Sequence, residues 1–225
     1  MSDADSFIEE VTEEVRRDKL FAIFRKYGWL AGLLIVLIVG GAAYNEWRKA
    51  SERAASEALG DSVMSALAGQ TASERAEALG KVSTTDAEAQ VFLDLLAAAA
   101  RAEAENKDDA LALLDKIAAS PDAPEVYRQL ALLKAVILRG ADQDRAERLA
   151  VLEQLAIPGK PFRVNAMEQI ALVHYEFGNN EDAIAVLRTI LDEPEATQGL
   201  LQRAQQLIVA LGGDLSSEES TGEDG

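Results

Sequence analysis

The stretch that decides the fold is YGWLAGLLIVLIVGGAAYN, Tyr27 to Asn45. Its nineteen residues include no Asp, Glu, Lys or Arg. Because a helix rises about 1.5 Å per residue, the stretch spans roughly 28 Å, close to the hydrocarbon thickness of a bilayer. Trp29 lies near one end, and Tyr44 and Trp47 lie at the other, where polar-edged rings favour the membrane interfaces. The sequence therefore predicts one transmembrane helix over residues 27–47.

Two other interpretations of this stretch are a cleaved signal peptide and a buried core helix. The small residues at positions 40–43 could form a cleavage site. However, a signal peptide begins with a short basic segment, whereas residues 1–26 are long and rich in acids. A retained anchor fits this composition better, and residues 1–26 are expected to form a cytoplasmic amphipathic segment before it.

Basic residues close to the span predict its orientation. Five lie before the span and three after it: Arg16, Arg17, Lys19, Arg25 and Lys26, then Arg48, Lys49 and Arg53. Since cytoplasmic flanks carry the excess of Lys and Arg, we expect a cytoplasmic N-terminus and an outer C-terminal domain. Within the span, Gly28 and Gly32 form a G-x-x-x-G pair, and Gly40 falls on the same face. Such glycines allow close helix packing in lipid, although glycine is common in membrane helices anyway.

The composition of the remaining chain argues against catalysis. The 225 residues include 39 acids and 22 bases, giving a net charge of −17, and most of the excess of acids follows residue 50. Such a surface repels nucleic acid. There is no cysteine and one histidine, His174, which is more often a packed residue than a catalytic base. Phosphate-binding loops and metalloprotease motifs are absent. We expect no catalytic, metal or cofactor site and no small-molecule substrate.

After the span the pattern predicts helices alone, and therefore an all-α fold. Residues 48–85 are expected to form a helical stalk and linker, and residues 212–225 a disordered acidic tail. The expected helices of the domain between them, residues 86–211, are 86–105, 108–119, 124–139, 142–156, 161–177, 180–192 and 195–211.

The clearest repeating unit is Val164–Thr197, VNAMEQIALVHYEFGNNEDAIAVLRTILDEPEAT. It resembles a tetratricopeptide repeat, a helix–turn–helix of about 34 residues. Ala171 and Ala183 would let the two helices cross closely, Gly178 would form the turn, and Leu187 would fill the space toward the next pair. The resemblance predicts an α-solenoid of helix pairs, a class of fold that binds proteins.

A second copy begins near Val91. Ala98, Ala110 and Leu114 match in order, but the turn glycine is missing. Ala110 and Ala183 lie 73 residues apart, which is about two repeats.

A middle copy, residues 126–160, is degenerate. Either Arg145 or Ala146 takes its small position.

The first helices of such repeats line a concave face. On this alignment, six positions form a candidate partner groove: Leu95, Ala99, Ala102, Glu168, Leu172 and Tyr175. Packing between helices is the alternative role for each of them. Because these positions include no Lys or Arg, hydrophobic or basic partner segments are expected rather than acidic peptides.

The whole layout resembles the YfgM-type ancillary subunit of the bacterial SecYEG translocon. The opening F-I-E-E-V-x-E-E-V-R-R-D-K-L is similar to that of alphaproteobacterial members. The resemblance implies a single-pass inner-membrane protein whose periplasmic domain links the translocon to periplasmic chaperones. The alternative is a scaffold or assembly factor for another envelope complex, either a respiratory complex or the cell-division apparatus, which would need the same anchor and the same domain.

Overall fold

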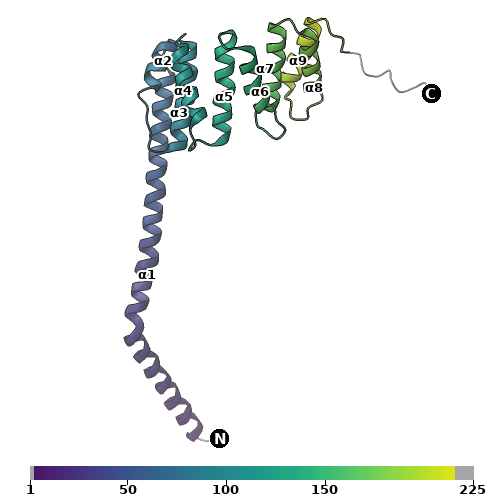
Figure 1. The fold of residues 1–225 in the computed structure, drawn as a ribbon. Helices are drawn as coiled ribbons and strands as arrows, with labels where there is room; N and C mark the ends of the chain where they lie inside the picture. The colour runs from purple at the N-terminus through teal and green to yellow at the C-terminus, as the bar shows by residue number, and fades with distance from the viewer. Residues whose placement is uncertain (1–2, 216–225) are drawn as a thin grey trace, which may run out of the picture. The chain divides into compact units, whose positions relative to one another are not determined.

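The computed structural model describes residues 3–215, with side chains from Arg25 onward except those of Tyr27 and Ala31. Every regular element in this range is a helix, which confirms the all-α class (Figure 1). The helices are α1 (Asp3–Leu67), α2 (Ala72–Leu79), α3 (Ala87–Glu103), α4 (Lys107–Ala119), α5 (Glu125–Arg139), the short 3-10 helix η1 (Gly140–Asp142), α6 (Arg145–Leu155), α7 (Arg163–Glu176), α8 (Asn180–Leu191) and α9 (Gln198–Ala210).

The seven helices expected from residue 86 onward correspond to α3 through α9, each end lying within three residues of its prediction. Helix starts follow from local capping. Asn106, for example, begins α4 by accepting a hydrogen bond from the amide of Asp109, and Asp144 caps α6 in the same way. Two predictions lie outside the described residues: the side-chain pattern of the amphipathic segment before Arg25, and the disorder of the tail from residue 216.

The chain forms two compact units, Met1–Gly60 and Asp61–Gly225. In the first unit, α1 contains the apolar stretch. From Gly28 it is long and apolar enough to cross a membrane, and its most apolar 18 residues have a mean hydropathy of 1.7 and are not buried. Trp29, Tyr44 and Trp47 are all exposed. A helix that is apolar all round and unburied is suited to a lipid environment.

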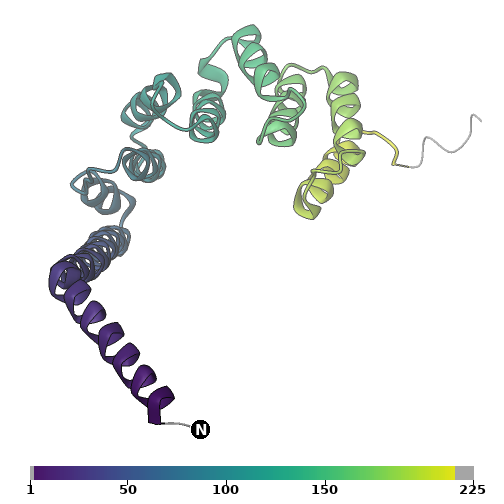
Figure 2. The same cartoon turned by 90° about the horizontal axis from the view of Figure 1, so that it is seen from below.

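In the second unit each core cluster is made by three consecutive helices. The clusters join α1, α2 and α3; then α3, α4 and α5; then α5, α6 and α7; then α7, α8 and α9. α3 shows how an odd-numbered helix is shared, because Leu95 and Ala98 face one cluster while Ala97 and Ala100 face the other. α4, α6 and α8 give buried residues to one cluster only. In Figure 2 the helices from α2 to α9 accordingly follow one another in chain order.

The second unit is built from two copies of a four-helix segment, related by a shift of 73 residues. The shift carries the first residues of α2, α4 and α5 onto those of α6, α8 and α9: Ala72 to Arg145, Lys107 to Asn180, and Glu125 to Gln198. Buried residues recur unchanged at the same shift: Leu79 and Leu152, Ala98 and Ala171, Ala110 and Ala183, Leu114 and Leu187, Ile117 and Ile190, Ala131 and Ala204. We call α2–α5 the first copy and α6–α9 the second copy.

This duplication explains why the middle repeat looked degenerate. α6 buries Arg148, Leu152 and Leu155. The same spacing, four residues and then three, separates the buried residues of α4, which begin with Ala110, and those of α8, which begin with Ala183. The expectation that Arg145 or Ala146 takes the small position is therefore wrong, because Arg148 stands there. At the shift of 73 residues α6 corresponds to α2, so Arg148 corresponds to Arg75.

An ion pair makes an arginine acceptable at this crossing. Arg148, with a side chain only 5% exposed, pairs with Glu176 on α7, and its Nη2 lies 3.3 Å from Glu176 Oε1. The first copy has the same pair at the same shift, since Arg75 Nη2 lies 2.7 Å from Glu103 Oε2. The aliphatic stem of the arginine packs in the crossing, while the guanidinium reaches a carboxylate at the helix edge.

Ion pairs also fix the segments between helices. Arg163 on α7 pairs with Glu193, which follows α8; Nη2 lies 2.6 Å from Oε1, and both side chains are largely buried. The hydrogen bond from Arg163 lowers the pKa of Glu193. Lys160 pairs with Glu125 of α5, and this hydrogen bond likewise lowers the pKa of Glu125. The charged forms of both carboxylates therefore stabilise the folded unit.

Candidate functional site

An apolar pocket of about 350 Å³ opens in the first copy between α3, α4 and α5. Its walls come from Ala98, Ala99, Ala102, Leu114, Lys134, Ile137 and Leu138. Ala99 and Ala102 are two of the six predicted groove positions, and Ala98 and Leu114 are two of the predicted repeat-core positions. The pocket is hollow here because α3 presents methyl groups where longer side chains would fill the space.

The rim of the pocket combines apolar surface with a single charge. Ile137 is 48% exposed, which is unusual for an isoleucine in the middle of a helical domain. Lys134 is the only charged residue of the lining, and among the described residues no carboxylate lies within ion-pair distance of its ammonium group. In a chain with a net charge of −17, this pocket therefore presents an unpaired cation beside apolar surface.

The other four predicted groove positions do not line this pocket. Leu95 is buried in the core cluster of α3, α4 and α5. Glu168 is also buried and receives two hydrogen bonds from Arg203 of α9, at 2.7 Å and 3.0 Å. Leu172 is half-buried and Tyr175 is 52% exposed, both on α7. The structure thus brings together the α3 positions Ala99 and Ala102, and it places the α7 positions elsewhere.

The predicted repeat-core positions lie where close packing requires them. The buried ones are Ala98, Ala110, Leu114, Ala171, Ala183 and Leu187, each at most 3% exposed. Gly178 instead forms the turn between α7 and α8 and has a φ of 75°. In the first copy the corresponding residue is Glu105, whose φ is 61°.

The glycines of the span face open space. At Gly28, Gly32 and Gly40 an added Cβ would meet no atom of the described chain within 4 Å. The same is true of Gly41, so the packing role of Gly28, Gly32 and Gly40 stays a prediction from their sequence spacing.

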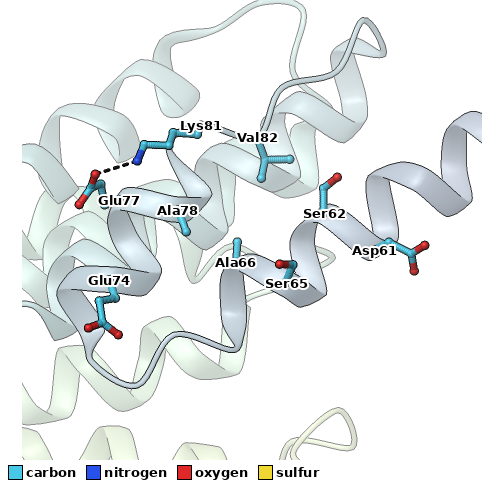
Figure 3. Close-up of a pocket in the computed structure, with 9 residues that line it drawn as sticks. All are labelled: Asp61, Ser62, Ser65, Ala66, Glu74, Glu77, Ala78, Lys81 and Val82. Atoms are coloured by element: carbon cyan, nitrogen blue, oxygen red, sulfur yellow. Dashed lines mark hydrogen bonds and ion pairs between the residues drawn. The ribbon is translucent and has the colours of Figure 1, made fainter.

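A second hollow, of about 600 Å³, lies between the end of α1 and α2 (Figure 3). Ser62 and Ala66 on α1 lie opposite Val82 and Ala78. The hollow is open, and six of its nine lining residues are polar or charged. Its acids have local roles. Glu77 pairs with Lys81 at 2.8 Å, and Glu74 caps α2 by accepting hydrogen bonds from the backbone before it. This hollow therefore carries more polar and charged side chains than the pocket between α3, α4 and α5, where Lys134 is the one charged residue of the lining.

The described residues contain no group of three or more His, Asp or Glu side chains that could hold a metal ion. His174 is largely buried, with Nδ1 3.5 Å from Asp182 and 3.3 Å from the guanidinium of Arg145. Its neighbours are thus one anion and one cation at the junction of α6, α7 and α8, a packed environment within the helix stack.

Sequence reasoning missed three residues of the pocket, Lys134, Ile137 and Leu138. All three lie on α5, in the degenerate middle repeat, whereas the six predicted groove positions lie only on α3 and α7. Comparing the chain with itself at a shift of 73 residues would have paired α5 with α9 and indicated that α5 forms a wall of the first copy.

Comparisons of the chain with protein-family models, with curated proteins and with solved structures give no match. Function is therefore inferred from the span and the pocket.

Proposed function

We propose that this chain is a membrane-anchored adaptor that binds other proteins and catalyses no reaction. The observation that carries this proposal is the open apolar pocket between α3, α4 and α5, on a domain that follows a helix apolar enough to span a membrane. An exposed apolar hollow on an acidic domain is suited to a peptide segment of another protein.

The helical domain is proposed to be a tetratricopeptide-like solenoid. Two features support this arrangement: consecutive helices pack side by side, and each of α3, α5 and α7 is shared between two core clusters. In such stacks each unit buries its apolar face only against its neighbours, which leaves an extended surface for binding.

The proposed setting is the bacterial inner membrane, with the N-terminus in the cytoplasm and the domain in the periplasm. The resemblance of the N-terminal segment to YfgM-type proteins favours an ancillary role at the SecYEG translocon, where the domain would connect the channel to periplasmic chaperones. The span would pack laterally through Gly28, Gly32 and Gly40, because their face is unobstructed.

Topology is tested by adding protease to spheroplasts. We expect digestion of the domain and protection of a small N-terminal fragment that contains the span. A mature protein that begins near Tyr44 would show cleavage of a signal peptide and would contradict the anchor.

Partner identity is tested by photocrosslinking in living cells. A photoreactive residue at Ile137 reports on the pocket, and one at the exposed Ala185 of α8 serves as the matched control. We expect Ile137 to capture translocon subunits or periplasmic chaperones. Capture of only respiratory or division proteins would refute the translocon proposal in favour of a scaffold for those complexes. Capture of no protein would refute the adaptor itself.

Lateral packing is tested in the same cells. Gly28→Leu with Gly32→Leu should reduce recovery of the translocon, because the added side chains block close approach. Gly41→Leu adds one leucine on a different face of the helix and should leave recovery unchanged, whereas Gly32→Leu alone should already reduce it.

A further inference from the structure

The pocket of the first copy has a counterpart in the second copy. The shift of 73 residues carries its open α3 wall, Ala99 and Ala102, onto Leu172 and Tyr175 of α7. It carries Lys134 of α5 onto Leu207 of α9. At these three positions the first copy therefore has two alanines and a lysine, whereas the second copy has two leucines and a tyrosine.

The backbone around these positions is alike in the two copies. Both turns that follow, at Glu105 and at Gly178, have a positive φ, and both place the next amide on a carbonyl five residues back at 2.9 Å. The buried partners Ala98 and Leu114 also recur as Ala171 and Leu187. The difference between the copies therefore lies in the side chains of the pocket, and not in the helices that frame it.

From this difference we infer that the pocket receives an apolar side chain, aliphatic or aromatic, from a partner protein whose segment also carries a carboxylate that pairs with Lys134. This inference rests on the proposed adaptor function and names the partner chemistry of its site. The side-chain types inferred for the partner, aliphatic and aromatic, are those that the second copy has at the corresponding sequence positions, Leu172 and Tyr175.

Charge complementarity favours the acidic partner segment. Lys134 is the only charged residue of the lining, and among residues 25–215 it forms no ion pair. In the second copy the corresponding Leu207 packs against the core cluster and needs no partner. The sequence predicts hydrophobic or basic partners, because the six predicted groove positions include no Lys or Arg; Lys134 lies on α5, outside them. The lysine revises the charge expected of the partner.

The probe for this inference is a set of fluorescent twelve-residue peptides. One carries Leu and Tyr three positions apart with flanking glutamates; a second has lysines in place of the glutamates; a third has alanines in place of Leu and Tyr. Affinities are measured by fluorescence anisotropy with the full chain in lipid nanodiscs, and empty nanodiscs correct for binding to lipid. We expect the first peptide to bind at least about tenfold more tightly than either of the others.

The decisive variant places the second copy's own residues in the first copy. Ala99→Leu with Ala102→Tyr should fill the pocket and weaken binding of the glutamate peptide by at least about tenfold. Ala112→Leu with Ala119→Tyr adds the same side chains at exposed positions of α4 outside the pocket, and should leave the affinity unchanged.

Lys134→Glu changes one exposed side chain without adding bulk, so it tests the charge even where the filled variant fails to fold. It should reverse the preference between the glutamate and lysine peptides. Unchanged binding by a folded Ala99→Leu/Ala102→Tyr variant, an unchanged preference in Lys134→Glu, or no binding by the wild type would each overturn the inference. The adaptor proposal survives any of these results as long as Ile137 still captures a protein in cells.

Discussion

The turns after α3 and α7 share a left-handed backbone conformation but have different residues in it. Gly178 and Glu105 are corresponding residues, with φ values of 75° and 61°. In both turns the following amide closes the helix end, Asn179 donating to the carbonyl of His174 and Asn106 to that of Arg101, at 2.9 Å each. The left-handed conformation favours glycine, so one copy has the favoured residue and the other does not.

The magnitude follows from two opposing terms. A residue with a Cβ costs about 1–2 kcal/mol in the left-handed region. Alanine in place of glycine recovers about 0.4–1 kcal/mol, because it restricts the unfolded chain. Gly178→Ala should therefore lower the free energy of unfolding by about 1 kcal/mol. Glu105→Gly should raise it by roughly 0.5–1 kcal/mol, since the same terms apply with the opposite sign and the Glu105 side chain is exposed.

The assay is thermal unfolding of the full chain in mild detergent, followed by circular dichroism. A change of 1 kcal/mol corresponds to about 2–4 °C in Tm for a chain of this size. Glu105→Ala removes the charge without relieving the backbone and serves as one control. Gly80→Ala, at a helix end with a φ of −65°, serves as the other and should not lower Tm. A Gly178→Ala variant as stable as the wild type, or a Glu105→Gly variant no more stable than Glu105→Ala, would refute the proposed equivalence of the turns.

Five further substitutions test the packing and the ion pairs by the same measurement. Ala183→Leu should overpack the crossing of α7 and α8 and lower the free energy of unfolding by about 1–3 kcal/mol. Ala185→Leu, on the exposed face of α8, should stay within about 0.5 kcal/mol of the wild type. Equal effects would show that Ala183 is not at the crossing. Arg148→Ala should lower the free energy of unfolding by about 2–3 kcal/mol, because its guanidinium is buried against Glu176. Arg75→Ala should lower it by only about 0–1 kcal/mol, because Glu103 is 63% exposed. A larger loss for Arg75→Ala would contradict the burial argument. Because Arg163 lowers the pKa of Glu193, the charged carboxylate stabilises the folded state above the ordinary glutamate value of 4.5, and this stabilisation is lost as the pH falls through the lowered pKa. The Tm gap between Glu193→Gln and the wild type should therefore be full at pH 7 and shrink toward pH 3, and a constant gap would rule out the ion pair as its cause.

Local sequence determined the helices and their ends. Helix formation depends on the spacing of apolar residues and on capping groups within a few positions, so the seven helices of the domain could be predicted within three residues of their observed ends. The apolar stretch from Tyr27 and the buried alanines Ala98 and Ala183 could be read in the same way, because their signals are contained in one helix or one helix pair.

Tertiary structure alone decided which helices meet. Arg148 is buried where α6 crosses its neighbour because Glu176, on α7, lies within reach of its guanidinium. The sequence of α6 alone does not indicate that this charged residue is buried. Glu105 adopts a left-handed turn that its residue type disfavours, since the packing of α3 against α4 holds it there. The pocket depends on α5 closing over the short side chains Ala99 and Ala102. Such contacts join residues that are distant in the chain, so no local pattern contains them, and they determine where the apolar pocket lies.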